Sequence, residues 1–288
     1  MKRRTLLIFI CGLAAGFILS SALFIAADAR TGLKNFVISL RAADTVKVPI
    51  LMYHHFTEDI EKVSNSTITP DKFKSDLEAL TAAGFNTVTF QDLIDYAHDG
   101  KKLPDNPVAI TFDDGYLSFY EYAYPLLAEK GMKASASIIG VSAGKDKNAN
   151  GPIIPHFSYE QAKEMKDSGL IDIVSHTYDL HGDGLIKLEN ESDSDFTARI
   201  KADSDVIQSQ FHDNMGFYAQ ALVYPYGKAS PLSEQCLKDL GYKATVIIGE
   251  SFSSIIKNDP SSLYMLRRIN VNQDLSGNDL INKIRGLI

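Results

Sequence analysis

The chain has 288 residues, of which 45% are hydrophobic and 23% charged, a composition typical of a globular protein rather than a disordered or collagen-like one. Its formal net charge of −7 argues against a nucleic-acid partner, because proteins that bind nucleic acids usually present a basic face. The two cysteines, Cys11 and Cys236, exclude a disulfide framework and a four-cysteine metal site, so any metal would be held by histidines and carboxylates.

The N-terminal segment predicts export. Basic residues at positions 2–4 precede an uncharged, mostly apolar run over 5–27, which as a helix would be about 34 Å long. This length is sufficient to span a bilayer core, and the basic start would stay in the cytoplasm. The sequence Ala-Asp-Ala at 27–29 also offers a cleavage site, so residues 1–29 are expected to be a membrane anchor or a cleaved signal peptide. Residues 30–47 would then be a linker.

From Val48 onward, short apolar runs alternate with amphipathic ones. Several of the apolar runs are almost continuous, as in parallel strands that are buried on both faces. The expected strands span residues 48–54, 86–90, 108–112, 133–139, 172–176, 221–226, 243–248 and 265–271.

Helical patterns lie between these strands. Thr69 and Pro70 are suited to begin a helix that ends at Gly84. Further helices are expected over residues 91–98, 117–130, 159–167, 192–211 and 231–240. The alternation predicts a single α/β domain over residues 48–288, either an incomplete barrel or an open doubly wound sheet.

Polar residues follow several strands at their carboxyl ends, where folds of this class bind ligands. Asp113 and Asp114 are adjacent carboxylates after a buried strand, and they would repel each other unless a cation or a proton compensated. Alternatively, they form a simple turn with Gly115. His176 and His181 are spaced as in a loop that turns back, and with one carboxylate they could bind a metal that keeps positions open for water and substrate.

Two further strand ends carry candidate residues. His54 and His55 end the first strand, and an imidazole that is charged near pH 7 can give a proton to a leaving group. The alternative is a solvated pair of histidines. The Tyr-Pro-Tyr-Gly turn at 224–227 could direct backbone N–H groups at a developing oxyanion, or it could merely end its strand.

In this order, the motifs resemble those of the polysaccharide deacetylases, carbohydrate esterase family 4, which have the NodB-homology fold. The resemblance rests on Thr-Phe-Asp-Asp-Gly at 111–115, Ser-His-Thr-Tyr-Asp-Leu-His at 175–181 and the turn at 224–227. Leu-Met-Tyr-His-His at 51–55 is similar to the branch that deacetylates poly-β-1,6-N-acetylglucosamine, a biofilm exopolysaccharide. The resemblance covers about residues 48–271 and implies a distorted, incomplete (β/α) barrel of about seven parallel strands.

The resemblance also implies roles for individual residues. Asp113 is similar to the general base of the family. Asp114, His176 and His181 match the ligands of one divalent metal ion, which is expected to be zinc, although iron, cobalt and nickel suit the same ligands. This chain separates the two histidines by one residue more than the usual H-[ST]-x-x-H pattern.

Other matches concern proton donation and binding. The chain lacks the Arg-x-x-Pro-Tyr form of the third motif and a late Leu-x-His, which favours the permuted branch in which His54, charged, is the general acid. Arg268 is similar to the arginine that orients the base, and the backbone amide of Tyr226 matches the oxyanion donor. The expected substrate contacts are Tyr224, Pro225 and His55.

The resemblance implies an exported, metal-dependent de-N-acetylase that acts on extracellular poly-β-1,6-N-acetyl-D-glucosamine. The protein is expected at the extracellular face of the membrane, in the cell wall or in the medium, with a membrane contact if residues 1–29 stay attached. Two alternatives remain open at this point. One is a deacetylase of β-1,4-linked peptidoglycan or chitin, and the other is a surface protein that binds polysaccharide without catalysis.

Overall fold

The computed structural model describes residues 44–287, nearly all of them in one compact unit that begins at Val46. The predicted export segment and most of the predicted linker lie outside the described residues, so these two domain boundaries stay predictions. Within the described part of the chain, no helix combines the length and apolar character needed to cross a membrane.

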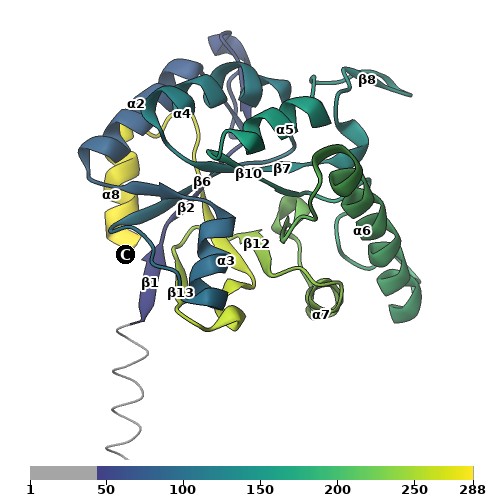
Figure 1. Ribbon diagram of the computed structural model, residues 1–288. Coiled ribbons are helices and arrows are strands. Elements are labelled where there is room, and N and C mark those ends of the chain that lie inside the picture. The colour runs from purple at the N-terminus through teal and green to yellow at the C-terminus, as the bar shows by residue number, and fades with distance from the viewer. Residues whose placement is uncertain (1–43, 288) are drawn as a thin grey trace, which may run out of the picture. The chain divides into compact units, whose positions relative to one another are not determined.

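Seven parallel strands form a closed barrel (Figure 1), because β2 pairs with β14 on one edge and with β6 on the other. The strands in order around the ring are β2 (Ile50–Tyr53), β14 (Leu266–Asn270), β12 (Ala244–Ile248), β11 (Ala221–Val223), β10 (Ile171–Ser175), β7 (Ala134–Ile138) and β6 (Pro107–Phe112). The predicted incomplete barrel is confirmed, with one strand fewer than the eight of a full (β/α) barrel.

The barrel is distorted at β6. An eighth strand, β5 (Asn86–Val88), pairs with the first residues of β6, whereas β7 pairs with its last residues, Thr111 and Phe112. One edge of β6 is therefore divided between two neighbours. All eight expected strands form, and some end earlier than predicted for a local reason. For example, β11 stops at Val223 because Pro225, which has no N–H to donate, begins a tight turn.

Helices cover the outside of the barrel (Figure 1). Around its sides lie α2 (Pro70–Ala82), α4 (Tyr124–Lys130), α5 (Tyr159–Asp167), α6 (Asp193–Met215), α7 (Pro231–Asp239) and α8 (Gly277–Leu287), whereas α3 (Phe90–Asp99) packs at one end. As predicted, the Thr69 side chain caps α2 by accepting a hydrogen bond from the backbone of Lys72. The helix α8, which packs beside α2, was not predicted from the sequence.

Short elements complete the described structure. The small strand pairs, none of them predicted, are β1 (Thr45–Val48) with β13 (Ser253–Ile256), β3 (His55–Phe56) with β4 (Thr67–Ile68), and β8 (Lys147–Asn148) with β9 (Gly151–Pro152). The short helical turns are η1 (Ile60–Lys62), η2 (Phe119–Ala123), η3 (Gly140–Ser142), η4 (Pro225–Gly227) and η5 (Pro260–Leu263).

The core has two parts, which follow the alternation of side chains along each strand. One hydrophobic cluster joins outward residues such as Leu51, Ile110 and Ile173 to the surrounding helices. A second cluster joins inward residues to the buried face of α3. Many of these inward residues, including Ile50 and Leu266, stand at the amino ends of their strands, so α3 fills that end of the barrel.

Candidate active site

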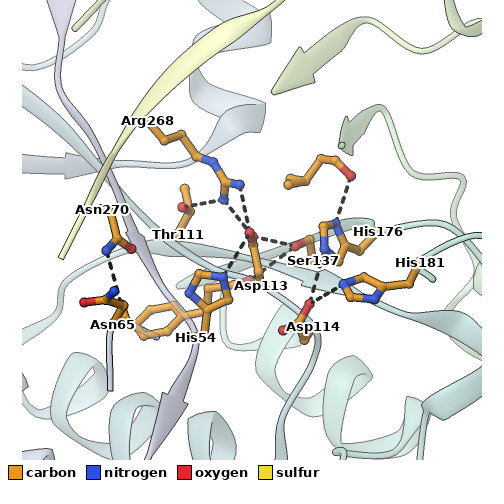
Figure 2. A network of polar contacts seen from close by, with 12 residues as sticks. His54, Asn65, Thr111, Asp113, Asp114, Ser137, His176, His181, Arg268 and Asn270 are labelled. Atoms are coloured by element: carbon orange, nitrogen blue, oxygen red, sulfur yellow. Dashed lines mark hydrogen bonds and ion pairs between the residues drawn. The ribbon is translucent and has the colours of Figure 1, made fainter. Parts of the chain in front are cut away.

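The carboxyl ends of the strands, opposite to α3, carry a polar network. Its members occupy the inward-facing positions at or just after the carboxyl halves of the strands, and all are buried. They are Thr111, Asp113, Ser137, His176 and Arg268. Figure 2 shows that these side chains converge from different strands, so residues that are far apart in the sequence meet at one place. Of the predicted site residues, the structure brings together His54, Asp113, Asp114, His176, His181 and Arg268.

Asp113 is held by Arg268 in a two-pronged ion pair. The Arg268 Nη1 and Nη2 groups donate to the two carboxylate oxygens at 2.6 and 2.8 Å, and Ser137 Oγ donates to Oδ1 at 2.9 Å. Burial alone would raise the pKa of Asp113, but Arg268 and His176 lower it to about 2. The structure therefore places Arg268, and not the exposed neighbour Arg267, at the predicted base, which is ionised at neutral pH.

We expect Ser137→Ala to lower the free energy of unfolding at pH 7 by about 1.5–3 kcal/mol, since the variant loses a buried hydrogen bond to a charged group. The Arg268 ion pair would remain, so the fold should persist. Urea titrations of the wild type and the variant would measure the difference, with Ser209→Ala on the exposed face of α6 as the control. Equal stability of the Ser137 and Ser209 variants would contradict this expectation.

Asp114, His176 and His181 form a second, separate group. Asp114 Oδ1 lies 3.2 Å from Nε2 of each histidine, and the three candidate ligand atoms lie within 4.8 Å of one another. Burial would raise the pKa of Asp114, but hydrogen bonds from His176 and His181 hold it well below its usual value. The carboxylate is therefore charged at neutral pH.

The geometry of this group fits a divalent cation. The His176 Nδ1 donates to the backbone carbonyl of Val223 at 2.8 Å, so in the neutral imidazole that binds a metal, the lone pair would be on Nε2, the nitrogen on the Asp114 side. In a tetrahedral zinc site with bonds of 2.0–2.1 Å, ligand atoms lie about 3.3 Å apart. The two separations of 3.2 Å between Asp114 Oδ1 and the histidine nitrogens are close to this value, and three protein ligands would leave a position open, as a catalytic metal site requires.

Three residues around the candidate site have a strained backbone. Asp114, Thr177 and Tyr226 all have positive φ values, of 71°, 71° and 56°. Such values cost a residue other than glycine of the order of 1–3 kcal/mol, and they persist where the surrounding structure imposes them. All three lie in loops directly after barrel strands, so part of the backbone strain lies at the candidate site, although other residues with positive φ, such as Asn106 and Asn258, lie elsewhere.

His54 lies beside the base, with its Nε2 3.8 Å from Oδ2 of Asp113. Burial lowers the pKa of His54 below its ordinary value, although the charges of Asp113 and Asp114 act in the opposite direction. The neighbouring His55 is hydrogen-bonded through Nδ1 to Ser118 Oγ at 2.8 Å, and its ring is edge-on to Tyr116. The roles predicted for both histidines stay predictions.

The turn at Pro225–Gly227 presents its three predicted residues differently. Tyr224 is fully buried, and its hydroxyl donates to Glu234 on α7 at 3.1 Å. This side chain therefore points away from the three candidate metal ligands, Asp114, His176 and His181, which are called the metal-type residues below. Pro225 is also buried. Tyr226 is 54% exposed, and its ring lies 4.9 Å from that of His181. Substrate contacts and an oxyanion role for this turn stay predictions.

Two residues near the centre were not identified from the sequence. Ser137 holds the carboxylate of Asp113, as described above. Tyr116 has a raised pKa, because of burial first and then of the nearby charge of Asp114, to which its hydroxyl is hydrogen-bonded. Tyr116 follows the Asp-Asp-Gly motif directly, which is the one sequence signal that could have indicated its position.

Comparisons with known proteins identify the family of this chain. The polysaccharide deacetylase family model matches residues 100–245. YxkH of Bacillus subtilis, named as a polysaccharide deacetylase, is 32% identical over 83% of this chain and 76% of its own length. A poly-β-1,6-N-acetyl-D-glucosamine N-deacetylase of Staphylococcus epidermidis is 31% identical over 58% of this chain and 56% of its own length.

A solved structure supports the fold. IcaB from Ammonifex degensii superposes with a TM-score of 0.67 at 24% identity, over 82% of this chain and 96% of that one. Fold, motifs and relatives therefore agree, and the chain belongs to the polysaccharide deacetylase family, hydrolases that remove N-acetyl groups from polysaccharides.

Proposed function

We propose that this deacetylase is metal-dependent and acts outside the cell on poly-β-1,6-N-acetyl-D-glucosamine. The observation that carries the proposal is that the adjacent carboxylates of Asp113 and Asp114 have different partners. Arg268 and Ser137 hold Asp113, whereas His176 and His181 face Asp114. The polymer is suggested by relatives that are named as deacetylases of this polysaccharide, including one from Staphylococcus aureus that is 25% identical over 76% of this chain.

Asp114, His176 and His181 would hold the metal ion. A divalent cation, with zinc as the first choice, supplies a Lewis acid that polarises the acetyl carbonyl and lowers the pKa of water. Asp114 is charged and His176 has its tautomer fixed by Val223, so both are prepared as ligands before a cation arrives.

Asp113 and His54 would move the protons. Asp113 accepts a proton from the water that attacks the amide carbon. The protonated carboxyl is then a strong acid, since Arg268 favours its ionised form, and it can pass the proton to the His54 imidazole beside it. Burial lowers the pKa of His54, so this imidazole is mainly neutral beforehand at pH 7, in contrast to the charged form expected from the sequence. It gives the proton to the amine nitrogen as the C–N bond breaks, and the products are acetate and glucosamine.

Metal removal tests the proposal. We expect a chelator to reduce acetate release from β-1,6-linked N-acetylglucosamine oligomers by at least about 100-fold, and added zinc or cobalt to restore it. β-1,4-linked oligomers, treated in parallel, serve as the control for linkage. Release from the β-1,4 oligomers instead would contradict the proposed polymer. No release from either, with metal shown to be bound, would contradict the proposed reaction.

The extracellular location is a separate part of the proposal. It rests on the basic and apolar sequence of residues 1–29 and on the expected substrate. Fractionation of cells that express the full chain would place it in the membrane, the wall or the medium. Recovery in the cytoplasm alone would contradict export.

A further inference from the structure

The loop between the two metal-type histidines has a demanding geometry. It leaves β10 at Ser175 and must return His181 to Asp114 within five residues of His176. It does so through Thr177, whose φ of 71° is unfavourable for a β-branched residue. Something outside the loop must therefore keep this path in place, because the backbone on its own favours a different one.

Backbone groups of the preceding segment hold one side of the loop. The amides of Gly140 and Val141 donate to the carbonyls of Thr177 and Tyr178 at 3.0 and 2.8 Å. The fit is close, since a Cβ at Gly140 would come within 2.8 Å of the Tyr178 ring. These contacts use the carbonyl oxygens of the loop and leave its N–H groups to be satisfied from elsewhere.

The carboxylate of Asp203 holds the other side. Its Oδ2 accepts from the amide of Tyr178 at 2.8 Å, and its Oδ1 accepts from the amide of Asp179 at 2.7 Å. Asp203 lies on α6, far from the motif in sequence, and is partly buried. Because each oxygen takes its own N–H, a carboxylate suits this position better than an amide, which has one acceptor oxygen.

We propose that Asp203 is a positioning residue that sets the metal affinity of the site by holding the loop that carries His181. This inference rests on the proposed metal-dependent function. His176 is fixed independently, by its strand and by Val223, whereas the Tyr226 ring and hydroxyl are near neighbours of His181 but lie in an exposed turn. The hydrogen bonds from the loop to Asp203 on α6 therefore act on His181, one of the three candidate ligands.

The test measures zinc affinity on the full-length chain by competition with a chromophoric chelator. We expect Asp203→Ala to weaken zinc binding by about 10–100-fold, the effect typical of losing an outer partner of a ligand. Asp203→Asn, which keeps one acceptor, should lie between this variant and the wild type. Asp205→Ala, on the exposed face of the same helix, should bind zinc within about twofold of the wild type.

A double-mutant cycle separates positioning from general destabilisation. With His181 already replaced by alanine, Asp203→Ala should have little further effect on zinc affinity, because the residue through which it acts is gone. Thermal unfolding without metal would show whether each variant is folded. If Asp203→Ala does not fold, Asp203→Asn takes its place in the cycle. An equal loss in the His181→Ala background, or wild-type affinity in both Asp203 variants, would overturn the inference alone. Failure of the wild type to bind zinc would overturn the proposed metal site itself.

Discussion

Asp113→Asn is expected to reduce kcat for deacetylation by about 10²–10⁴-fold while zinc stays bound, the range typical of losing a general base. The asparagine side chain fills the same space, but it cannot accept the proton of the attacking water. The metal-type residues are held by different partners, Val223 and Asp203 among them, so they should keep their places. Single-turnover rates and zinc content, measured on the same preparation, would test this expectation.

Asp114→Asn is the matched variant, one residue away. It removes the charge that faces both His176 and His181, so we expect zinc affinity to fall by at least about 100-fold and activity to fall with it. Excess zinc should restore part of the activity of Asp114→Asn and none of that of Asp113→Asn. Mild and equal effects of the two substitutions would show that the aspartates do not have separate roles.

Arg268→Met is expected to lower the free energy of unfolding by about 3–5 kcal/mol at pH 7, since it leaves the Asp113 carboxylate buried without its cation. The loss depends on pH. In the wild type, the pKa of Asp113 is about 2, below its unfolded value, so ionisation stabilises the fold above about pH 4 and this contribution is lost toward pH 2. Without Arg268, burial would raise the pKa, and the difference between the proteins should shrink as the pH falls.

Urea unfolding at several pH values between 7 and 4 would measure this difference. Arg267→Met is the control, because Arg267 is the adjacent residue on β14 and is exposed. The acid limb of the activity profile should also move to higher pH in Arg268→Met, since the base would then be protonated at higher pH. A pH-independent stability difference would show that lost packing, and not the ion pair, accounts for the effect.

The sequence predicted the barrel well because its strands are continuous apolar runs, such as Pro107–Phe112, that are buried along their whole length. It also indicated the metal-type residues, since they follow strand ends directly. It did not indicate strands of two residues such as β3, which have no measurable periodicity. It also missed α8 at the C-terminal end of the chain, whose contacts with α2 form only in the folded state.

The residues that support the site were harder to find than those that form it. Ser137 lies in an Ala-Ser-Ala-Ser-Ile strand, where a small polar residue gives no sign that its hydroxyl meets Asp113. Asp203 lies within a long helix that also carries exposed acidic residues, and its partners are 24 and 25 positions away. Their roles depend on distance in space, to which the local sequence pattern does not respond.

The α3 helix also determines how a long polymer can use this enzyme. Because side chains fill the inside of the ring and α3 covers its amino end, a sugar chain can reach the buried polar network only from the opposite rim. An acetyl group would then enter, and acetate would leave, by the same mouth.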